Sequence, residues 1–379
     1  MFLLRRLFYL LLLIGCLILI SFAFLWKNFV YTPLSLSKSE IIYVAPGSSI
    51  FSVANMLDSK GILQRPKMLI FFAHLLHQEK KLKAGEYKVD PGTTPKELLS
   101  KIVQGKVLLR HFTIVEGWTL KQVYAAINGN QYLSHTINQL MPIEISKKIG
   151  FNGENFEGYL YPDTYLFARG VADVIIIKKA FLSMQKNLTK LWPTRAQGLP
   201  YNDPYSALIV ASLIEKETAQ PSERSKVAGV IVRRLQKKML LQIDAAVIYG
   251  LGSDYTGKIT WEDLKKDTPF NTYLHPGLPP TPIAMPSLPS IIAALHPEAG
   301  TALFYVGRGD GTHEFTVSLD QHHAAIRKYH VGHLAPDDND SKLPLRKDYI
   351  PWFGELNGYQ LNLLLGLPSE TGKVNDSEN

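Results

Sequence analysis

The stretch Asp203-Pro-Tyr-Ser-Ala-Leu-Ile-Val-Ala-Ser-Leu-Ile-Glu-Lys-Glu-Thr218 predicts a helix that carries an acid on its apolar face. Its first Asp supplies an N-cap, and the following Pro suits the first helical position. At about 100° per residue, Glu217 lies within about 50° of the centre of the apolar face, Glu215 lies farther round, and Lys216 points to the polar side. Because burial disfavours a carboxylate, Glu217 is expected to have the raised pKa of a general acid. The alternative is an ordinary amphipathic helix whose Glu pairs with a nearby Arg.

Composition indicates a globular chain long enough for two modest domains. It has 379 residues, of which 46% are hydrophobic and 20% are charged. The net charge of +8 suits a surface facing anionic lipid, an acidic polymer or nucleic acid, so charge alone selects no partner. Since no nucleic-acid-binding module accompanies the charge, we expect no nucleic-acid partner.

The N-terminus predicts a single membrane-crossing helix over residues 7–26, which are uncharged and mostly apolar. About 20 such residues cross a bilayer. Arg5 and Arg6 precede this run, so the N-terminus is expected in the cytoplasm and everything after Lys27 on the outer side of the cytoplasmic membrane. Two alternatives are a cleaved signal peptide and a lipoprotein signal, Leu13-Ile-Gly-Cys16, whose Cys would be lipidated. The length of the run favours a retained helix.

Cys16 is also the only cysteine in the chain. The part after the apolar run therefore has no intramolecular disulfide, no thiol nucleophile and no thiolate metal site. The histidines fit no metal-binding helix motif, and Gly307-Arg-Gly-Asp-Gly-Thr312 lies in a predicted hairpin rather than before a helix. We therefore expect no metal and no nucleotide cofactor.

A weak repeat follows the apolar run. The segments Val44-Ala-Pro-Gly-Ser-Ser49, Val89-Asp-Pro-Gly-Thr-Thr94 and Ile114-Val-Glu-Gly-Trp-Thr119 each combine a strand end, a glycine turn and a hydroxyl N-cap. The helices predicted after them cover residues 50–60, 95–104 and 120–127. Such units resemble LysM glycan-binding modules, and a purely structural spacer explains the same pattern.

Farther along, Glu157-Gly-Tyr-Leu-Tyr-Pro-Asp-Thr-Tyr165 is rich in aromatic residues and contains two acids, Glu157 and Asp163. Aromatic faces and carboxylates are typical of sugar sites, although tyrosines in turns more often serve packing. Helical periodicity returns over residues 174–191 and 225–237. The proline-rich segment from Gly277 to Pro289 predicts an extended loop, and residues 303–317 predict two strands around a glycine-rich turn.

From residue 211 to 313 the chain resembles the YceG-like (MltG) family of endolytic murein transglycosylases. The motifs that carry the resemblance include Ala211-Ser-Leu-Ile-Glu-Lys-Glu-Thr218, Ser222-Glu-Arg224, Leu241-Gln-Ile-Asp244, Val247-Ile-Tyr249, Asn271-Thr-Tyr273 and Gly277-Leu-Pro-Pro280. Residues 157–165 match a further family segment. The resemblance implies that Glu217 is the catalytic acid, which agrees with the helical-wheel argument.

The resemblance also implies non-hydrolytic cleavage of the β-1,4 bond between MurNAc and GlcNAc in nascent glycan strands, with a 1,6-anhydro product. It places seven further residues as substrate contacts around the sugar or in the second shell, besides Asp163: Gln242, Asp244, Tyr249, Asn271, Thr272, Tyr273 and Glu157. The implied partners are peptidoglycan strands, the cytoplasmic membrane and the penicillin-binding proteins that synthesise the glycan.

The expected fold class is α+β, with a transmembrane helix, a small LysM-like module and a mixed catalytic domain that bears the Glu on a helix. The expected divisions are a tail (1–6), an anchor (7–26), a stalk (27–40), the module (41–108), a connecting region (109–200), the catalytic domain (201–332) and a C-terminal extension (333–379). Two alternative functions remain: a glycoside hydrolase with Asp244 or Glu157 as base or nucleophile, and a non-catalytic peptidoglycan-binding scaffold.

Overall fold

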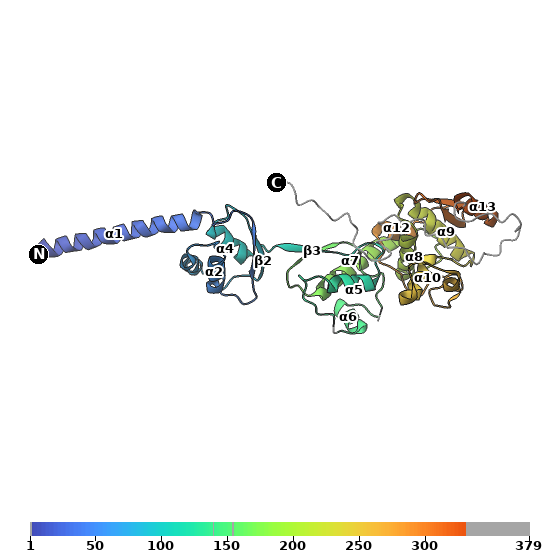
Figure 1. Cartoon of the computed structure of the whole chain (residues 1–379), viewed down its shortest axis with the longest axis horizontal. Coiled ribbons are helices and arrows are strands. Elements are labelled where there is room, and N and C mark those ends of the chain that lie inside the picture. The colour runs from blue at the N-terminus through green and yellow to red at the C-terminus, as the bar shows by residue number, and fades with distance from the viewer. Residues whose placement is uncertain (1, 139, 154, 331–379) are drawn as a thin grey trace. The chain divides into compact units, whose positions relative to one another are not determined.

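The computed structural model describes residues 2–138, 140–153 and 155–330 (Figure 1). Its helices are α1 (Phe2–Tyr31), α2 (Ile50–Ser59), α3 (Pro66–Leu75), α4 (Pro95–Gln104), α5 (Leu120–Asn128), α6 (Pro142–Ile149), α7 (Asp173–Leu191), α8 (Pro204–Glu217), α9 (Arg224–Gln236), α10 (Asp244–Leu251), α11 (Trp261–Lys265), α12 (Leu288–Leu295) and α13 (Leu319–His330). Its strands are β1 (Glu40–Val44), β2 (Gly85–Val89), β3 (Leu109–Thr113), β4 (Thr164–Ala168), β5 (Phe304–Gly307) and β6 (His313–Thr316), and 3-10 turns cover Trp192–Thr194, Pro221–Glu223 and Gly252–Asp254. The α+β class is confirmed. The predicted extension at 333–379 lies outside the described residues.

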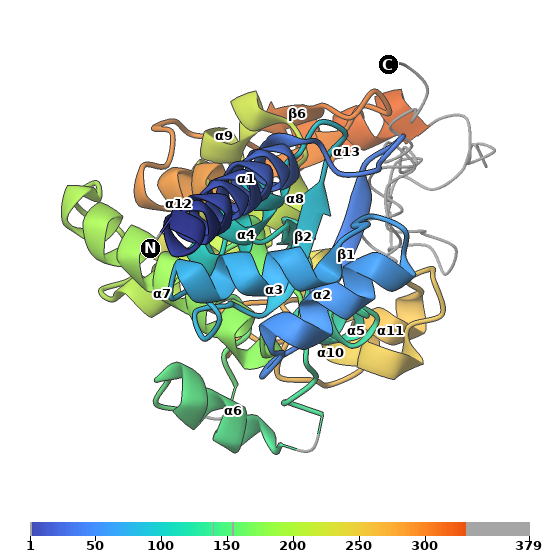
Figure 2. The same ribbon diagram turned by 90° about the vertical axis from the view of Figure 1, so that its left-hand side faces the viewer.

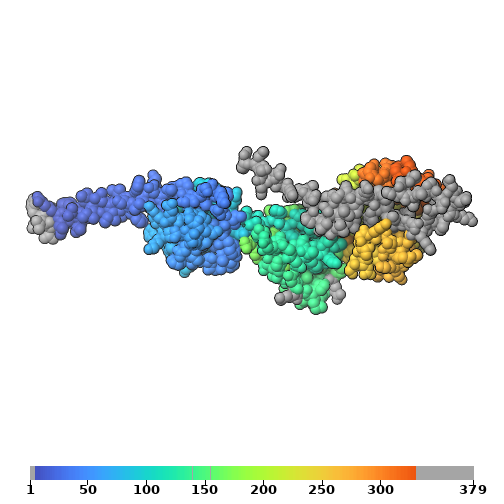
Figure 3. Space-filling model, viewed as in Figure 1, coloured from blue at the N-terminus to red at the C-terminus, as the bar shows by residue number. Residues whose placement is uncertain are grey.

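Helix α1 confirms the apolar helix predicted at the N-terminus. Its segment Arg5–Tyr31 is long and apolar enough to cross a membrane, and none of its most apolar window is buried in the protein. The space-filling view shows the side of α1 that faces the viewer uncovered by other atoms (Figure 3). Apolar surface of this length is stable when lipid covers it.

Packing divides the chain into two compact units. Among the described residues, the first comprises 2–111, 132–134 and 166–171, and the second comprises 112–131, 135–165 and 172–330. In the first unit β1 and β2 pair antiparallel, with Glu40 opposite Val89. Fully buried side chains of Ile42, Leu57 and Leu98 join this strand pair to α2 and α4.

The three strand-turn-helix units form as predicted, and local chemistry explains why. Ser49, Thr94 and Thr119 are the N-caps of α2, α4 and α5, and each side chain accepts a backbone N–H of the first helical turn. The glycines before them adopt φ values of 77°, 88° and 76°, which a side chain would disfavour. The strand-turn-helix segments that begin at Val44 and Val89 lie in the first compact unit, and the glycine turn and helix of the segment that begins at Ile114 lie in the second.

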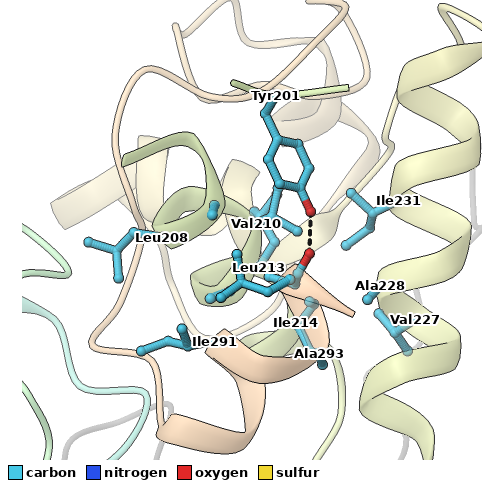
Figure 4. Close-up of a cluster of buried hydrophobic side chains, with 14 of the residues drawn as sticks. Tyr201, Leu208, Val210, Leu213, Ile214, Val227, Ala228, Ile231, Ile291 and Ala293 are labelled. Atoms are coloured by element: carbon cyan, nitrogen blue, oxygen red, sulfur yellow. Dashed lines mark hydrogen bonds between the residues drawn. The ribbon is translucent and has the colours of Figure 1, made fainter. Parts of the chain in front are cut away.

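Helix α8 is the centre of the second unit and begins as predicted, with the Asp203 side chain accepting the N–H of Ser206 at 2.9 Å. All residues from Ala207 to Ile214 are buried, and α8 packs against α9 and α12. Figure 4 shows this core, where the Tyr201 hydroxyl donates a hydrogen bond to the carbonyl of Ala294. A helix buried on all sides in this way holds its last turn rigidly.

In the C-terminal part of the second unit, one predicted hairpin is confirmed and one predicted boundary is corrected. Strands β5 and β6 pair antiparallel, with Gly307 opposite His313, as the predicted hairpin requires. The assignment of Pro289 to the extended loop was wrong, because α12 begins at Leu288 and includes it. A proline is compatible with a first helical turn, where its missing N–H would have no intrahelical partner.

Candidate active site

Glu217 is the last residue of α8, and it is half-buried at the end of the helix. Tyr305 on β5 donates its hydroxyl hydrogen bond to Glu217 Oε2 at 2.7 Å. Burial raises the pKa of Glu217 to about 7; the Tyr305 hydrogen bond opposes this rise, as does the charge of Arg234, whereas the Asp244 charge reinforces it. The raised pKa predicted from the helical wheel is confirmed, so near neutral pH the group can both give and accept a proton.

Tyr305 was not among the site residues that the sequence indicated. It lies 88 residues from Glu217 in the chain, and the only sequence signal was its position in the predicted hairpin. Its ring contacts those of His313 and Phe315, and burial raises the pKa of its hydroxyl well above the ordinary value. The hydroxyl therefore remains a hydrogen-bond donor to the Glu217 carboxyl over the whole physiological pH range.

Asp244 is the first residue of α10, and its charge raises the pKa of Glu217, so these two acids and the side chains that contact them form one cluster. Tyr273 donates a hydrogen bond to Asp244 Oδ1 at 2.5 Å. Burial raises the pKa of Asp244 to about 6, and the Tyr273 hydrogen bond lowers it. The structure thus brings together three of the residues that the sequence indicated, Glu217, Asp244 and Tyr273.

Arg234 on α9 ties this cluster to the neighbouring loop. Its guanidinium donates to the carbonyls of Leu303 at 2.7 Å and Leu241 at 2.9 Å, and to the side chain of Gln242 at 3.2 Å. Gln242 is exposed and adopts a positive φ of 54°, an uncommon conformation for a residue with a side chain. The exposed Gln242 side chain, oriented by Arg234, remains accessible to a ligand beside the cluster.

Asn271 and Thr272 are buried, and their side chains bind backbone groups of the protein. The Asn271 amide donates to the carbonyls of Leu264 and Lys266 at 2.9 and 2.7 Å. The Thr272 hydroxyl accepts the N–H of Ile243 at 2.8 Å. These bonds fix the segments on either side of Asp244 and Tyr273, so Asn271 and Thr272 position the cluster from within.

Glu157, which is buried, and the half-buried Tyr249 form a separate pair. The Glu157 carboxylate accepts the N–H of Leu120 at the start of α5 at 2.8 Å and the hydroxyl of Tyr249 at 3.0 Å. Burial raises the pKa of Glu157 to about 7. The Glu157 carboxylate lies at the N-terminus of α5, where a negative charge stabilises the helix. Asp163, by contrast, is exposed and accepts the N–H of its neighbour Thr164 at 2.7 Å.

Replacing Glu157 with Ala is expected to lower the free energy of unfolding by about 2 kcal/mol, because the half-buried Leu120 N–H would lose its side-chain acceptor and the half-buried Tyr249 hydroxyl would lose one of its partners. Denaturant unfolding of the full chain in detergent micelles measures this. Asp163→Ala, in the same segment, is the control and should change the unfolding midpoint little, because the side chain is exposed. Equal effects of the two substitutions would contradict the assignment.

The other two charged residues of the Glu-Lys-Glu sequence have different partners. Glu215 pairs with Arg224 at 3.4 Å and accepts the N–H of Ser287 at 2.9 Å. Lys216 was expected to point to the polar side of the helix. Instead it donates to the carbonyl of Gly117 at 3.3 Å, and burial lowers its pKa to about 8. The Glu–Arg pair of the alternative interpretation thus exists, and it involves Glu215 rather than Glu217.

Fold and site together define an α+β protein with an apolar N-terminal helix and a centre in which a protonatable Glu is held at a helix end by a Tyr. More particularly, the chain belongs to the YceG-like family, whose model matches residues 42–328.

Its relatives include the endolytic murein transglycosylase of Bacillus subtilis (strain 168), which is 29% identical over 332 residues, covering 82% of this chain and 91% of that protein. The endolytic murein transglycosylase of Streptococcus pneumoniae (strain D39) is 26% identical over 302 residues, covering 71% of this chain and 54% of that protein. A crystal structure of a YceG-like protein from Listeria monocytogenes has 29% sequence identity and a TM-score of 0.48, and the match covers 76% of this chain and 99% of that chain.

Proposed function

We propose that this protein is an endolytic murein transglycosylase with Glu217 as its catalytic acid and base. The observation that carries the proposal is the Glu217 carboxyl, whose pKa is raised to about 7 and which is held by Tyr305 at the end of a rigid helix. Family membership and the names of the relatives support the reaction class.

In the proposed reaction, protonated Glu217 gives its proton to the glycosidic oxygen between MurNAc and GlcNAc as the C1–O bond of MurNAc breaks. The resulting Glu217 carboxylate then takes the proton from the C6 hydroxyl of the same MurNAc, whose oxygen bonds to C1. The products are a 1,6-anhydroMurNAc end and a GlcNAc end, and Glu217 regains its proton. The nearby Arg234 and Tyr305 stabilise the carboxylate between the two steps.

The other indicated residues have two proposed roles. Gln242, Asp244 and Tyr273 lie at or beside the cluster and are proposed to contact the sugar. Asn271 and Thr272 position them through backbone bonds. Glu157 and Tyr249 hold the start of α5, and exposed Asp163 remains a proposed contact for a longer glycan.

Mass spectrometry of the products formed by the full chain from uncross-linked glycan strands tests this proposal. Anhydro-ended fragments of mixed length are expected. The electrostatic coupling of Asp244 to Glu217 favours one second candidate, a glycoside hydrolase in which Asp244 activates water. Reducing-ended fragments would establish that candidate, and binding without cleavage by folded protein would establish a scaffold.

The rate should depend on pH through Glu217. The acid must begin protonated, and burial raises its pKa to about 7, so kcat/KM is expected to fall about tenfold per pH unit above that value. Because the Tyr305 hydrogen bond lowers the pKa of Glu217, Tyr305→Phe should move this fall to higher pH. A pH profile of product formation measures the shift.

Tyr273→Phe is the matched control for that experiment. It removes the hydrogen bond that lowers the pKa of Asp244, so Asp244 carries less charge and raises the pKa of Glu217 less. The fall in rate should then stay in place or move to lower pH. A profile of Tyr305→Phe that coincides with the wild type would contradict the role of Tyr305.

We further propose that α1 crosses the cytoplasmic membrane with Arg5 and Arg6 on the inner side, so that the site acts on newly made glycan next to the membrane. The chain would then act beside the penicillin-binding proteins that polymerise glycan and would limit strand length. Deleting its gene should lengthen the glycan strands, and an unchanged length distribution would refute this role.

A further inference from the structure

The end of α1 contacts α3 through aromatic rings. Phe71 of α3 meets Phe22 and Trp26 of α1 edge to face, with ring centroids 6.0 and 5.7 Å apart. Phe72, the next residue of α3, meets Trp26 at 5.2 Å. The view from the N-terminal side shows α1 and α3 side by side (Figure 2). All four rings belong to the first compact unit.

This contact fixes the depth of α3 when α1 crosses a membrane. Trp26 is the last residue of the uncharged run 7–26 that spans the hydrocarbon. Phe22 precedes it by one helical turn, about 6 Å along the axis, and therefore lies inside that run. A side chain that touches Phe22 from the side, as Phe71 does, must itself lie at the boundary between acyl chains and head groups.

The surface of α3 suits that boundary. Phe71, Leu75 and Leu76 are 47%, 55% and 43% exposed. Phe71 and Leu75 follow Lys67 at helical spacing of four, so they form one stripe that ends in a cation. Between residues 60 and 83 there is one acidic residue, Glu79, against these basic residues: Lys60, Arg65, Lys67, Lys80, Lys81 and Lys83.

We propose that α3 is an interfacial helix that docks the first unit onto an anionic lipid surface. The stripe of Phe71 and Leu75 enters the acyl boundary, and the basic residues around it bind the lipid head groups. The first unit is then held flat against the bilayer at two places, α1 and α3, instead of swinging on a single anchor. This inference requires α1 to cross the membrane and is independent of the reaction proposed for Glu217.

Spin labels on single cysteines in the full chain test it. The protein is reconstituted in vesicles of phosphatidylcholine with phosphatidylglycerol, and collisions of each label with oxygen and with a water-soluble nickel chelate give its depth. One label is placed at Leu75→Cys and a matched one at Leu109→Cys, both in a Cys16→Ser background. Leu109 is similarly exposed at 51%, lies in the same unit and is the first residue of β3, which Figure 1 shows away from α1. Native Cys16, labelled in the unmodified chain, reports whether α1 spans the bilayer.

We expect the ratio of oxygen to nickel collisions to be severalfold higher at position 75 than at position 109, and to fall at position 75 in vesicles of phosphatidylcholine alone. Equal ratios at 75 and 109, with the Cys16 label deep in the bilayer, would overturn the docking of α3. Spin–spin broadening at position 75 would identify a second copy of the chain as the occupant and would also overturn it. A Cys16 label exposed to nickel would overturn the spanning helix on which the inference depends. Equal ratios at position 75 in neutral and anionic vesicles would overturn the role of the basic residues.

Discussion

Glu217→Gln is expected to lower kcat by about 10²–10⁴-fold, the usual contribution of a general acid. The amide of Gln has no proton to give to the glycosidic oxygen and cannot take one from the C6 hydroxyl. Its carbonyl oxygen can still accept the Tyr305 hydrogen bond, which is 2.7 Å long in the wild type. The site should therefore keep its geometry, and glycan binding should change little. Release of anhydro-ended fragments, measured by mass spectrometry against time, gives the rate.

The unfolding midpoint is the control for this substitution. Burial disfavours the Glu217 carboxylate, so a neutral isostere should not lower stability. Cleavage by Glu217→Gln at more than a tenth of the wild-type rate would assign the acid to another residue. In that case Asp244, the other carboxyl of the cluster, would be the next to replace.

Glu215→Ala, two residues earlier on the same helix, is expected to lower the free energy of unfolding by about 3 kcal/mol. Glu215 accepts the N–H and hydroxyl of Ser287 at 2.9 and 2.5 Å and pairs with Arg224. Removing it leaves the Arg224 guanidinium buried with only the hydroxyls of Ser287 and Ser290. Burial and the Glu215 charge raise the pKa of Glu116, and the nearby Arg224 charge opposes this rise, so Glu116 offsets part of the loss.

Denaturant unfolding of the full chain in detergent micelles measures the effect, with Glu217→Gln as the matched control from the same helix turn. The double substitution Glu215→Met with Arg224→Met removes both charges and should recover much of the stability. If Glu215→Ala were as stable as the wild type, the bonds from Glu215 on α8 to Ser287, at the start of α12, would not contribute to stability.

Local patterns predicted much of the fold. Ser49, Thr94 and Asp203 cap their helices as expected, because a capping side chain and the backbone N–H that it accepts lie within three residues of each other. The ends of α2, α4, α5, α7, α8 and α9 agree with the predicted ones to within a residue, whereas α1 extends beyond the predicted residues 7–26 at both ends. The long apolar helix at the N-terminus likewise needs no information from elsewhere in the chain.

The partners of the polar side chains could not be predicted in this way. The sequence indicated Asn271 and Thr272 as residues around the sugar or in the second shell, but it contains no sign that their side chains bind backbone carbonyls and amides. Likewise, it gave no reason to connect Glu157 with the start of α5, which lies 37 residues away. Such bonds depend on how distant segments pack.

The sequence alone determined that one acid of the Glu-Lys-Glu motif lies on the apolar face of a helix, because helical periodicity is a local property. Only the tertiary structure decided what each acid does. Folding brings Tyr305 on β5 to Glu217, and Ser287 and Arg224 to Glu215, and these partners come from segments up to 88 residues distant. Burial and neighbouring charges set a pKa, and both are established only when those segments pack together.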